Sequence, residues 1–208
     1  MKLVEQAATD TLPKLLARNA REHPREPGMR EKDRGIWKTY SWRDCQGHVE
    51  AFALGLAANG FRRGDKLSVL GDNRVTLYWA QLASQAIGGL AVPLYQDSIA
   101  SELVYVLDHA EVSVVVAEDQ EQVDKVLSVR EQLPRLRLII FEDLLGMSGY
   151  RDPMLKSFAN VEKQGRAFHE ANSGHYETEL AKGTAADVAR HGHRSAHVDA
   201  CARPDRVG

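Results

Sequence analysis

The sequence predicts an α/β protein with a mostly parallel sheet flanked by helices. Short apolar or β-branched runs alternate with helix-length segments between residues 65 and 141. Crossovers of this length join parallel strands in a right-handed sense and lay helices on both faces of the sheet. With 208 residues, 43% of them hydrophobic, the chain is long enough for one such domain or for part of a larger one.

The first elements expected are a helix and a hairpin. Leucines at helical spacing, followed by His23-Pro24, predict a helix from about Leu12 to Glu22, because proline disfavours helix in the residue before it. The runs 28–31 and 36–40 flank a charged, glycine-containing turn, which is typical of a β-hairpin.

A second helix is predicted after the hairpin. Ser41 begins it in a capping-box-like pattern, with Asp44 three residues later. We expect it to end at Asn59-Gly60, because glycine readily adopts the left-handed conformation that closes helices.

The central block supplies the parallel sheet. Its expected elements are a strand at 65–70, a helix capped by Asn73 with Val75, Trp79, Leu82 and Ala86 on one side, a strand beginning at 90–92, a helix at about 99–109, a strand at 112–116, a helix at about 120–132 and a strand at 136–141. Pro93 cannot donate a backbone hydrogen bond, so its strand is expected to end there or to lie at an edge.

The pattern loosens after residue 142. We expect a turn at 150–153, a polar helix at 155–168 and a loop-like segment at 171–183. Residues 187–189 could begin a further strand, but no apolar continuation follows them.

Composition argues against a nucleic-acid-binding, a secreted disulfide-rich and a membrane-spanning protein. Lys+Arg 27 against Asp+Glu 29 leaves no global field to attract nucleic acid or anionic lipid. Cys45 and Cys201 make no disulfide framework, the N-terminus has no secretory pattern, and no apolar run approaches the ~18 residues of a membrane span. A soluble, cytoplasmic protein without a membrane span is predicted.

Several residues are candidates for catalytic or binding groups. Asp72 and Asn73 follow a parallel strand, where open α/β sheets bind ligands, although a helix cap is the favoured role of Asn73. His109 ends a helix and suits the negative end of its dipole. Cys45 has no matched histidine or acid and is expected to be a small packing residue.

The aromatic residues and the glycine segments give no site either. Tyr78 and Trp79 are expected in the core or a groove lining. Gly71–Arg74, Gly88-Gly89 and Lys182–Thr184 do not fit a GxGxxG or Walker-type phosphate loop. No catalytic, cofactor-binding or metal-binding residue is therefore assigned.

The segment 190–208 has a different composition: it contains no Leu, Ile, Phe, Tyr, Trp, Met, Lys or Glu. Its potential metal ligands are His191, His193, His197 and Cys201. Their spacing fits no common zinc pattern, and the flanks offer almost no apolar material for a packed shell. We expect an unstructured tail.

The residues up to about 189 resemble the N-terminal portion of an AMP-forming acyl-CoA synthetase of the long-chain fatty-acid type, in the adenylate-forming superfamily. The matching stretches are Thr11–Leu16, Tyr40–Trp42, Gly60–Lys66, Leu70–Arg74, Gly88–Tyr95, Leu107–Glu111 and Tyr150–Pro153. Each is weak alone, and their order and spacing are fairly specific together.

The resemblance implies the first α/β subdomain of an enzyme that joins a fatty acid or another carboxylate to AMP from Mg-ATP and then transfers the acyl group to coenzyme A. In the complete enzyme the cofactors would be ATP, magnesium and coenzyme A. The resemblance leaves peripheral membrane contact open.

The sequence departs from the family where ATP would first be held. A Thr-Ser-Gly-Thr-Thr-Gly-x-Pro-Lys type loop would follow residues 187–189, and Arg190-His-Gly-His stands there instead. We therefore expect a partial AMP-binding domain at 1–189 and an out-of-frame tail at 190–208. The predicted protein is a ligase fragment that is inactive alone. Because a sheet cut before its later strands exposes an edge and an apolar face, we expect this fragment to show poor solubility or chaperone dependence. The alternative is a non-catalytic regulatory or metal-binding module that pairs with a full-length synthetase.

Overall fold

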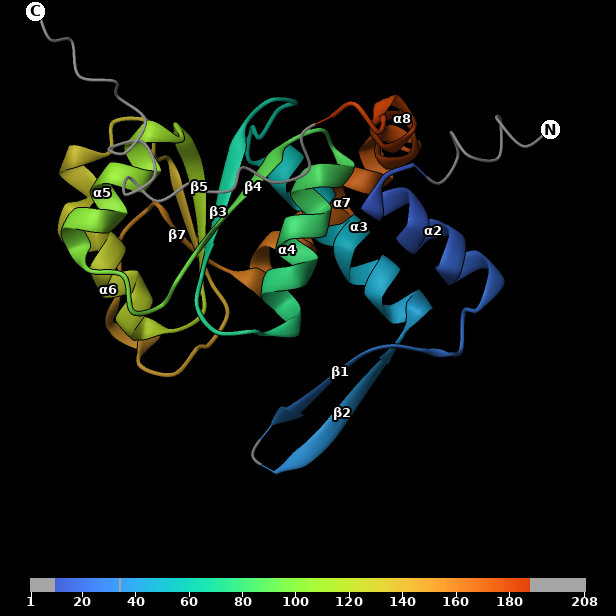
Figure 1. Ribbon diagram of the computed structural model, residues 1–208, viewed down its shortest axis with the longest axis horizontal. Coiled ribbons are helices and arrows are strands. Elements are labelled where there is room, and N and C mark those ends of the chain that lie inside the picture. Colours follow the sequence, from blue (N-terminus) through green and yellow to red (C-terminus); the bar gives the residue numbers. More distant parts are fainter. Residues whose placement is uncertain (1–9, 34, 188–208) are drawn as a thin grey trace, which may run out of the picture.

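The computed structural model describes residues 10–33 and 35–187, which form a sheet between two helical layers and a separate hairpin (Figure 1). The five-stranded sheet has the order β4-β3-β5-β6-β7, and every neighbouring pair is parallel. The antiparallel strands β1 and β2 pair with each other. The predicted α/β class with a mostly parallel, helix-flanked sheet is confirmed.

The described elements alternate along the chain much as predicted. The helices are α2 (Leu12–Glu22), α3 (Trp42–Ala58), α4 (Val75–Ala86), α5 (Ala100–His109), α6 (Gln120–Val129), α7 (Phe158–Ala171) and α8 (His175–Lys182), with short 3₁₀ turns at Arg130–Gln132 and Met147–Gly149. The strands are β1 (Pro27–Asp33), β2 (Ile36–Ser41), β3 (Lys66–Leu70), β4 (Leu90–Leu94), β5 (Val112–Ala117), β6 (Leu138–Phe141) and β7 (Leu155–Ser157).

The two faces of the sheet build two separate cores. Val114 and Val116 point into a core shared with α2, α3, α4, α7 and α8. Val115 points the other way, into a core with α5 and α6. This alternation is the period-two geometry of a strand, and it explains why the central strand β5 is buried on both faces. Figure 1 shows the two helical layers on opposite sides of the sheet.

Local sequence signals set several boundaries. Helix α2 has the predicted bounds, and Thr11 caps it by accepting a bond from the Lys14 backbone N–H. Ser41 and Asp44 form the predicted reciprocal capping box, with bonds of 2.9 and 3.2 Å. Pro93 lies in β4, an edge strand of the sheet, as its missing N–H requires.

Three local predictions are wrong. Asn73 does not cap α4: the cap position is Arg74, and the Asn73 side-chain oxygen accepts a bond from the Tyr78 hydroxyl instead. The helix expected from residue 155 starts at Phe158, because residues 155–157 pair with β6 as strand β7. The loop expected at 171–183 contains α8, which buries Tyr176 against the first core.

Helices α3 and α7 cross at very short range. A Cβ at Gly165 would clash with the carbonyl oxygen of Ala51, and one at Gly55 would clash with that of Val161. The rings of Phe52 and Phe158 stack beside the crossing, 4.1 Å apart. Glycine is therefore required at two facing positions for the backbones to approach.

None of the helices in residues 10–33 and 35–187 is both long enough and apolar enough to cross a membrane.

Candidate functional site

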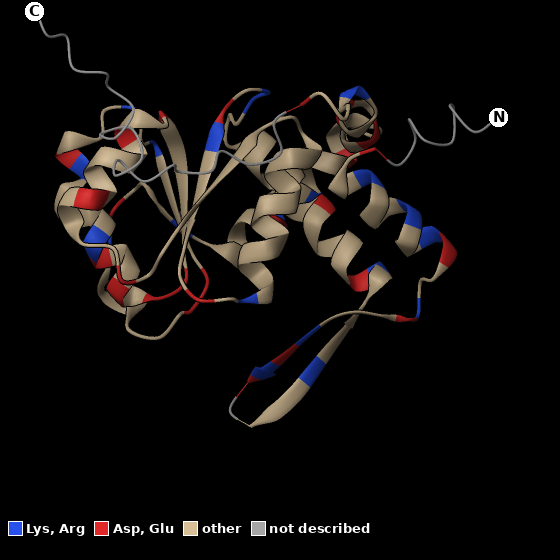
Figure 2. Cartoon of the chain, in the orientation of Figure 1, with Lys and Arg blue, Asp and Glu red and all other residues tan. Residues whose placement is uncertain are grey.

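The carboxyl ends of the parallel strands meet at one edge of the sheet, which we call the carboxyl edge. Open α/β sheets bind ligands at this edge. Here β3 is followed by Gly71-Asp72, β5 by Glu118 and β6 by Glu142. Figure 2 shows acidic residues along the loops at this end of the sheet.

Glu118 is the centre of the carboxyl edge. Its buried carboxylate accepts a 2.5 Å bond from the backbone N–H of Asp72 and a 2.7 Å bond from the Arg74 side chain. The bond to Glu118 raises the pKa of Arg74, so this guanidinium is already neutralised by a partner. Asp72, predicted as a candidate, contributes its backbone here.

Glu142 adds a second partly buried carboxyl group. Burial raises its pKa, attraction to Arg74 opposes this rise, and repulsion from Glu31 and Glu118 adds to it. Several acids thus surround one paired cation. An acidic edge repels the polyphosphate of a nucleotide and attracts positively charged groups. The part of the chain that the structure describes contains no group of three or more His, Cys, Asp or Glu arranged to hold a metal ion.

The base of the β1–β2 hairpin lies beside this edge. Aromatic contacts hold it there. The Tyr40 hydroxyl donates a 2.8 Å bond to Glu31, and burial raises the pKa of Tyr40. The Tyr40 ring meets Trp79 edge-on at 5.0 Å, and Trp79 stacks on His48 at 3.9 Å. Trp79 is buried in the core, one of the two places expected for it, whereas Tyr78 is exposed.

An open groove of about 540 Å³ runs along the α3–α7 crossing. His48 Nδ1 lies 2.6 Å from a Glu162 carboxylate oxygen, and His169 Nδ1 lies 3.7 Å from one of Glu50. Burial raises the pKa of Glu50. These histidines and acids face each other across the two helices, so their first role is to tie α3 to α7.

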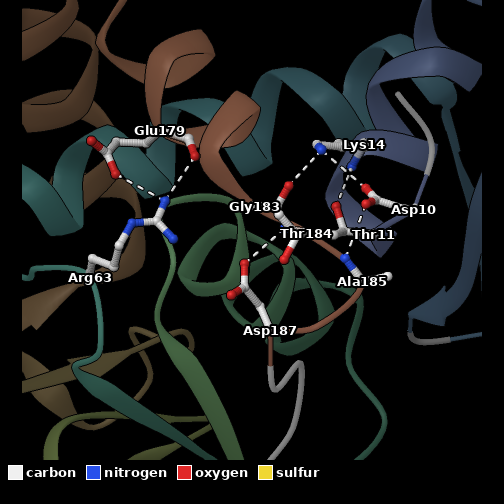
Figure 3. Close-up of polar contacts among 9 residues, drawn as sticks. All are labelled: Asp10, Thr11, Lys14, Arg63, Glu179, Gly183, Thr184, Ala185 and Asp187. Atoms are coloured by element: carbon white, nitrogen blue, oxygen red, sulfur yellow. Dashed lines mark hydrogen bonds and ion pairs between the residues drawn. The ribbon is translucent and has the colours of Figure 1, made fainter. Parts of the chain in front are cut away.

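The last described segment is fastened to the first helix (Figure 3). Lys14 Nζ donates to the Gly183 carbonyl at 2.6 Å and to the Asp10 carboxylate at 3.0 Å. The other oxygen of Asp10 accepts a 3.0 Å bond from the Ala185 backbone N–H. The Lys14 bond lowers the pKa of Asp10. We call these contacts the terminal clamp.

Neighbouring contacts hold α8 in the same way. Arg63 donates to the backbone oxygen and to the carboxylate of Glu179 at 3.0 and 3.1 Å. Lys182 pairs with the same carboxylate at 2.5 Å. The Lys182–Thr184 segment is thus the end of α8, where Lys182 forms an ion pair within the helix.

The remaining candidates do not gather into a site. His109 ends α5 and its ring stacks on Tyr105, with centroids 5.7 Å apart. Cys45 is fully buried, and burial raises the pKa of its thiol, so it packs as a small apolar side chain. The possible ligands of the tail, His191, His193, His197 and Cys201, lie outside the described residues.

Sequence reasoning missed the main residues of the carboxyl edge. Arg74, Glu118 and Glu142 were not singled out, although each acid directly follows an apolar strand. That position was the available signal, because consecutive parallel strands bring their following residues to one edge.

A model of a family described as AMP-binding enzyme matches residues 16–175. An uncharacterized protein of Mycobacterium tuberculosis is 38% identical over 89 residues, which are 43% of this chain and 50% of that protein. A long-chain-fatty-acid–CoA ligase of Xenopus laevis is 31% identical over 104 residues, and one of Mycobacterium bovis is 27% identical over 106 residues. The matches cover 50% and 51% of this chain but 14% and 18% of the two ligases. The matched part is thus half or less of each relative.

Solved structures share the fold. An acetoacetyl-CoA synthetase from Streptomyces lividans aligns with a TM-score of 0.65 at 24% identity, over 72% of this chain and 24% of that one. An anthranilate CoA ligase in complex with anthranoyl-AMP aligns with a TM-score of 0.64 at 18% identity, over 73% of this chain and 27% of that one.

Proposed function

The chain belongs to the AMP-binding enzyme family, and from this premise we propose that it is the N-terminal fragment of an ATP-dependent, AMP-forming long-chain fatty acid–CoA ligase. The complete enzyme would convert a fatty acid, ATP and coenzyme A into acyl-CoA, AMP and pyrophosphate, with magnesium on the nucleotide. The relatives named as long-chain-fatty-acid–CoA ligases support this substrate class.

We propose further that these 208 residues are inactive alone. The observation behind this proposal is the carboxyl edge, where Arg74 is already paired with Glu118 and the Glu142 carboxyl group lies near the same guanidinium. ATP needs the opposite surroundings, because its phosphates are stabilised by backbone N–H groups, hydroxyls and a lysine.

An ATP–pyrophosphate exchange assay with a long-chain fatty acid tests the proposal. We expect no exchange from the 208-residue chain, and robust exchange from the Mycobacterium bovis ligase as a positive control. Exchange catalysed by the 208 residues themselves would overturn the claim of inactivity.

The second candidate is a non-catalytic module that pairs with a synthetase. The observation behind it is the paired state of Arg74, whose guanidinium is already bonded to Glu118 at the carboxyl edge. Co-purification with a full-length synthetase would support this reading. Metal binding by such a module predicts zinc affinity that is lost in the Cys201→Ser variant.

The division of the chain is also a proposal. Residues 1–189 would be the partial AMP-binding domain, and 190–208 a tail read out of frame after a shift near residue 189. The nucleotide sequence beyond the stop codon tests this: one of the other frames should encode the rest of a synthetase. We propose a cytoplasmic location, as for an enzyme of acyl-CoA formation.

A further inference from the structure

The β1–β2 hairpin has two faces of different composition. Directly opposed residues of an antiparallel pair place their side chains on one face, and alternate residues along each strand share that face. Lys32 lies opposite Trp37, and Arg30 lies opposite Thr39. We call the face formed by these four residues the outer hairpin face. It carries two cations and an aromatic ring, and none of the acids in the part of the hairpin that the structure describes lies on it.

The inner face of the hairpin is turned toward the body of the domain. On this face the Tyr40 ring meets Trp79 of the core edge-on at 5.0 Å. The acids of strand β1 lie here as well: Glu31 accepts a 2.8 Å bond from the Tyr40 hydroxyl, and Asp33 pairs with Lys38 at 2.7 Å. The negative charges of the hairpin are therefore on its inner side, and its outer face is positive.

The outer face and the tip of the hairpin are open to solvent. Arg30 and Lys32 are exposed, and the Arg30 guanidinium lies 5.2 Å above the Trp37 ring. Trp37 is 59% exposed, and the neighbouring Ile36 at the tip is 71% exposed. Figure 1 shows the hairpin projecting away from the five-stranded sheet and its helices. The tip can therefore touch a flat surface ahead of the rest of the domain.

We propose that the outer hairpin face and the adjoining tip bind the surface of an anionic lipid bilayer. Lysine and arginine side chains are attracted to anionic headgroups, and tryptophan rings settle at headgroup level. The apolar side chain of Ile36 enters the boundary between headgroups and acyl chains, as the apolar side of an interfacial element does. This inference goes beyond the proposed function, because it requires no catalysis by the chain.

The tip favours a bilayer over single-stranded nucleic acid, the other partner that basic and aromatic groups attract. Nucleic acid binds through its phosphates and through bases stacked on successive aromatic rings. The outer hairpin face offers one ring, Trp37, and Ile36 beside it can neither stack nor pair with a base. A bilayer accommodates all three features, since it supplies anions at its surface and an apolar layer beneath them.

The attraction is local. The whole chain has Lys+Arg 27 against Asp+Glu 29, so it has no long-range pull toward anionic surfaces. Binding therefore depends on Arg30 and Lys32 at the point of contact, and it should weaken as salt screens them. These two cations are the natural target for mutation.

Co-sedimentation of the full 208-residue chain with vesicles tests the proposal. We expect binding to vesicles of phosphatidylcholine mixed with phosphatidylglycerol, and much weaker binding to phosphatidylcholine alone. The Arg30→Gln/Lys32→Gln variant should bind the mixed vesicles about 25-fold more weakly, because each cation near an anionic surface contributes roughly a fivefold factor. Arg21→Gln/Lys163→Gln is the matched control: it removes the same charges from exposed positions on α2 and α7 and should bind like the wild type.

Tryptophan fluorescence tests the apolar part of the contact. Brominated phosphatidylcholine in the mixed vesicles should quench the wild-type chain, and the Trp37→Ser variant should lose this quenching. The other two tryptophans make the assignment specific, because Trp79 is buried in the core and Trp42 packs against it. Quenching that persists in Trp37→Ser would contradict insertion of the hairpin.

The remaining outcomes separate the lipid site from its rivals, with every variant shown to be folded by circular dichroism. No binding of the wild type to the mixed vesicles, or an equal loss in both double variants, would refute the site. Binding of a single-stranded oligonucleotide in place of vesicles would assign the face to nucleic acid. Vesicle binding with the expected pattern supports the lipid site whatever the ATP–pyrophosphate exchange assay gives, so the ligase proposal stands or falls separately.

Discussion

The α3–α7 crossing and the exposed apolar side chains of the hairpin and of the loop after β6 are opposites within one domain. At the crossing, Gly55 and Gly165 bring two helix backbones into contact, and Phe52 and Phe158 beside them are buried. On the hairpin and on the loop after β6, Trp37 and Leu145 project into solvent, 59% and 76% exposed. The contrast shows that backbone contact and burial hold the helices together, whereas these two apolar side chains contribute little to the core.

The largest effect is expected from a substitution at the α3–α7 crossing. Gly165→Val would push a branched side chain into the backbone of α3, so we expect a loss of ~3 kcal/mol or more in the free energy of unfolding. Gly47→Ala is the control, since nothing lies within 4 Å of its Cβ position on the same helix α3. It should gain up to ~1 kcal/mol from helix propensity. Urea unfolding measures both, and equal stabilities would contradict the close crossing.

The next effect concerns the polar tie across the same helices. His48→Ala leaves the buried Glu162 carboxylate without its 2.6 Å partner and removes the stack on Trp79. We expect a loss of about 2 kcal/mol by urea unfolding, within the range for hydrogen bonds to charged groups. Glu162→Ala should cost less in the His48→Ala background than in the wild type. Additive losses would show that the pair is not coupled.

A smaller effect compares the two edges of the sheet through pH. The folded-state pKa of Glu142 is raised by burial, so ionising it costs stability, and this cost grows as pH rises from about 4.5 through the raised pKa. Glu142→Gln should therefore gain stability over the wild type between pH 4 and pH 7.

Glu111, at the opposite edge, is the control for this pH effect. Its pKa is lowered by bonding to Lys66 and by attraction to Arg135, so its contribution is present above pH 4.5 and is lost as pH falls through the lowered pKa. Glu111→Gln should lose stability at pH 7 and converge with the wild type at low pH. Parallel curves for the two variants in urea unfolding would refute the distinction between the edges.

The smallest expected effect sharpens the comparison from the exposed side. Trp37→Ser should change the free energy of unfolding by less than ~0.5 kcal/mol, because the side chain is mostly exposed and lies beneath the exposed Arg30 guanidinium. Differential scanning calorimetry of the isolated chain checks this. A large drop in the melting temperature would mean that Trp37 contributes to the core and is not an exposed side chain.

The elements that the sequence predicted well are those with strong local signals. The leucine spacing of α2 and the Ser41–Asp44 capping box act within one turn of helix, so they can be read from neighbouring residues. Strand β7 could not be found this way, because Leu155–Ser157 is a strand only through its pairing with β6. Helix α8 depends likewise on one buried anchor, Tyr176, which contacts a distant part of the chain.

The candidate site was harder to predict for the same physical reason. Asn73 has the residue type of a helix cap, but its oxygen is taken by Tyr78 and the helix starts after Arg74. Glu118 and Glu142 are 24 residues apart in sequence. They come together only because the strands before them, β5 and β6, are adjacent and parallel. Tertiary pairing decides the second outcome, whereas the first is decided by a local contact five residues along the chain.

The terminal clamp has a consequence for how the chain is made. Lys14 and Gly183 are 169 residues apart, and Asp10 and Ala185 are 175 apart, so these bonds span most of the nascent chain. Contacts between such distant residues carry a large loop-closure cost and tend to form late. On the ribosome, α2 can pack on α3 and α4 as soon as these helices have been made, whereas the clamp bonds have to wait for residue 185. The clamp should therefore be the last set of contacts that this helix gains.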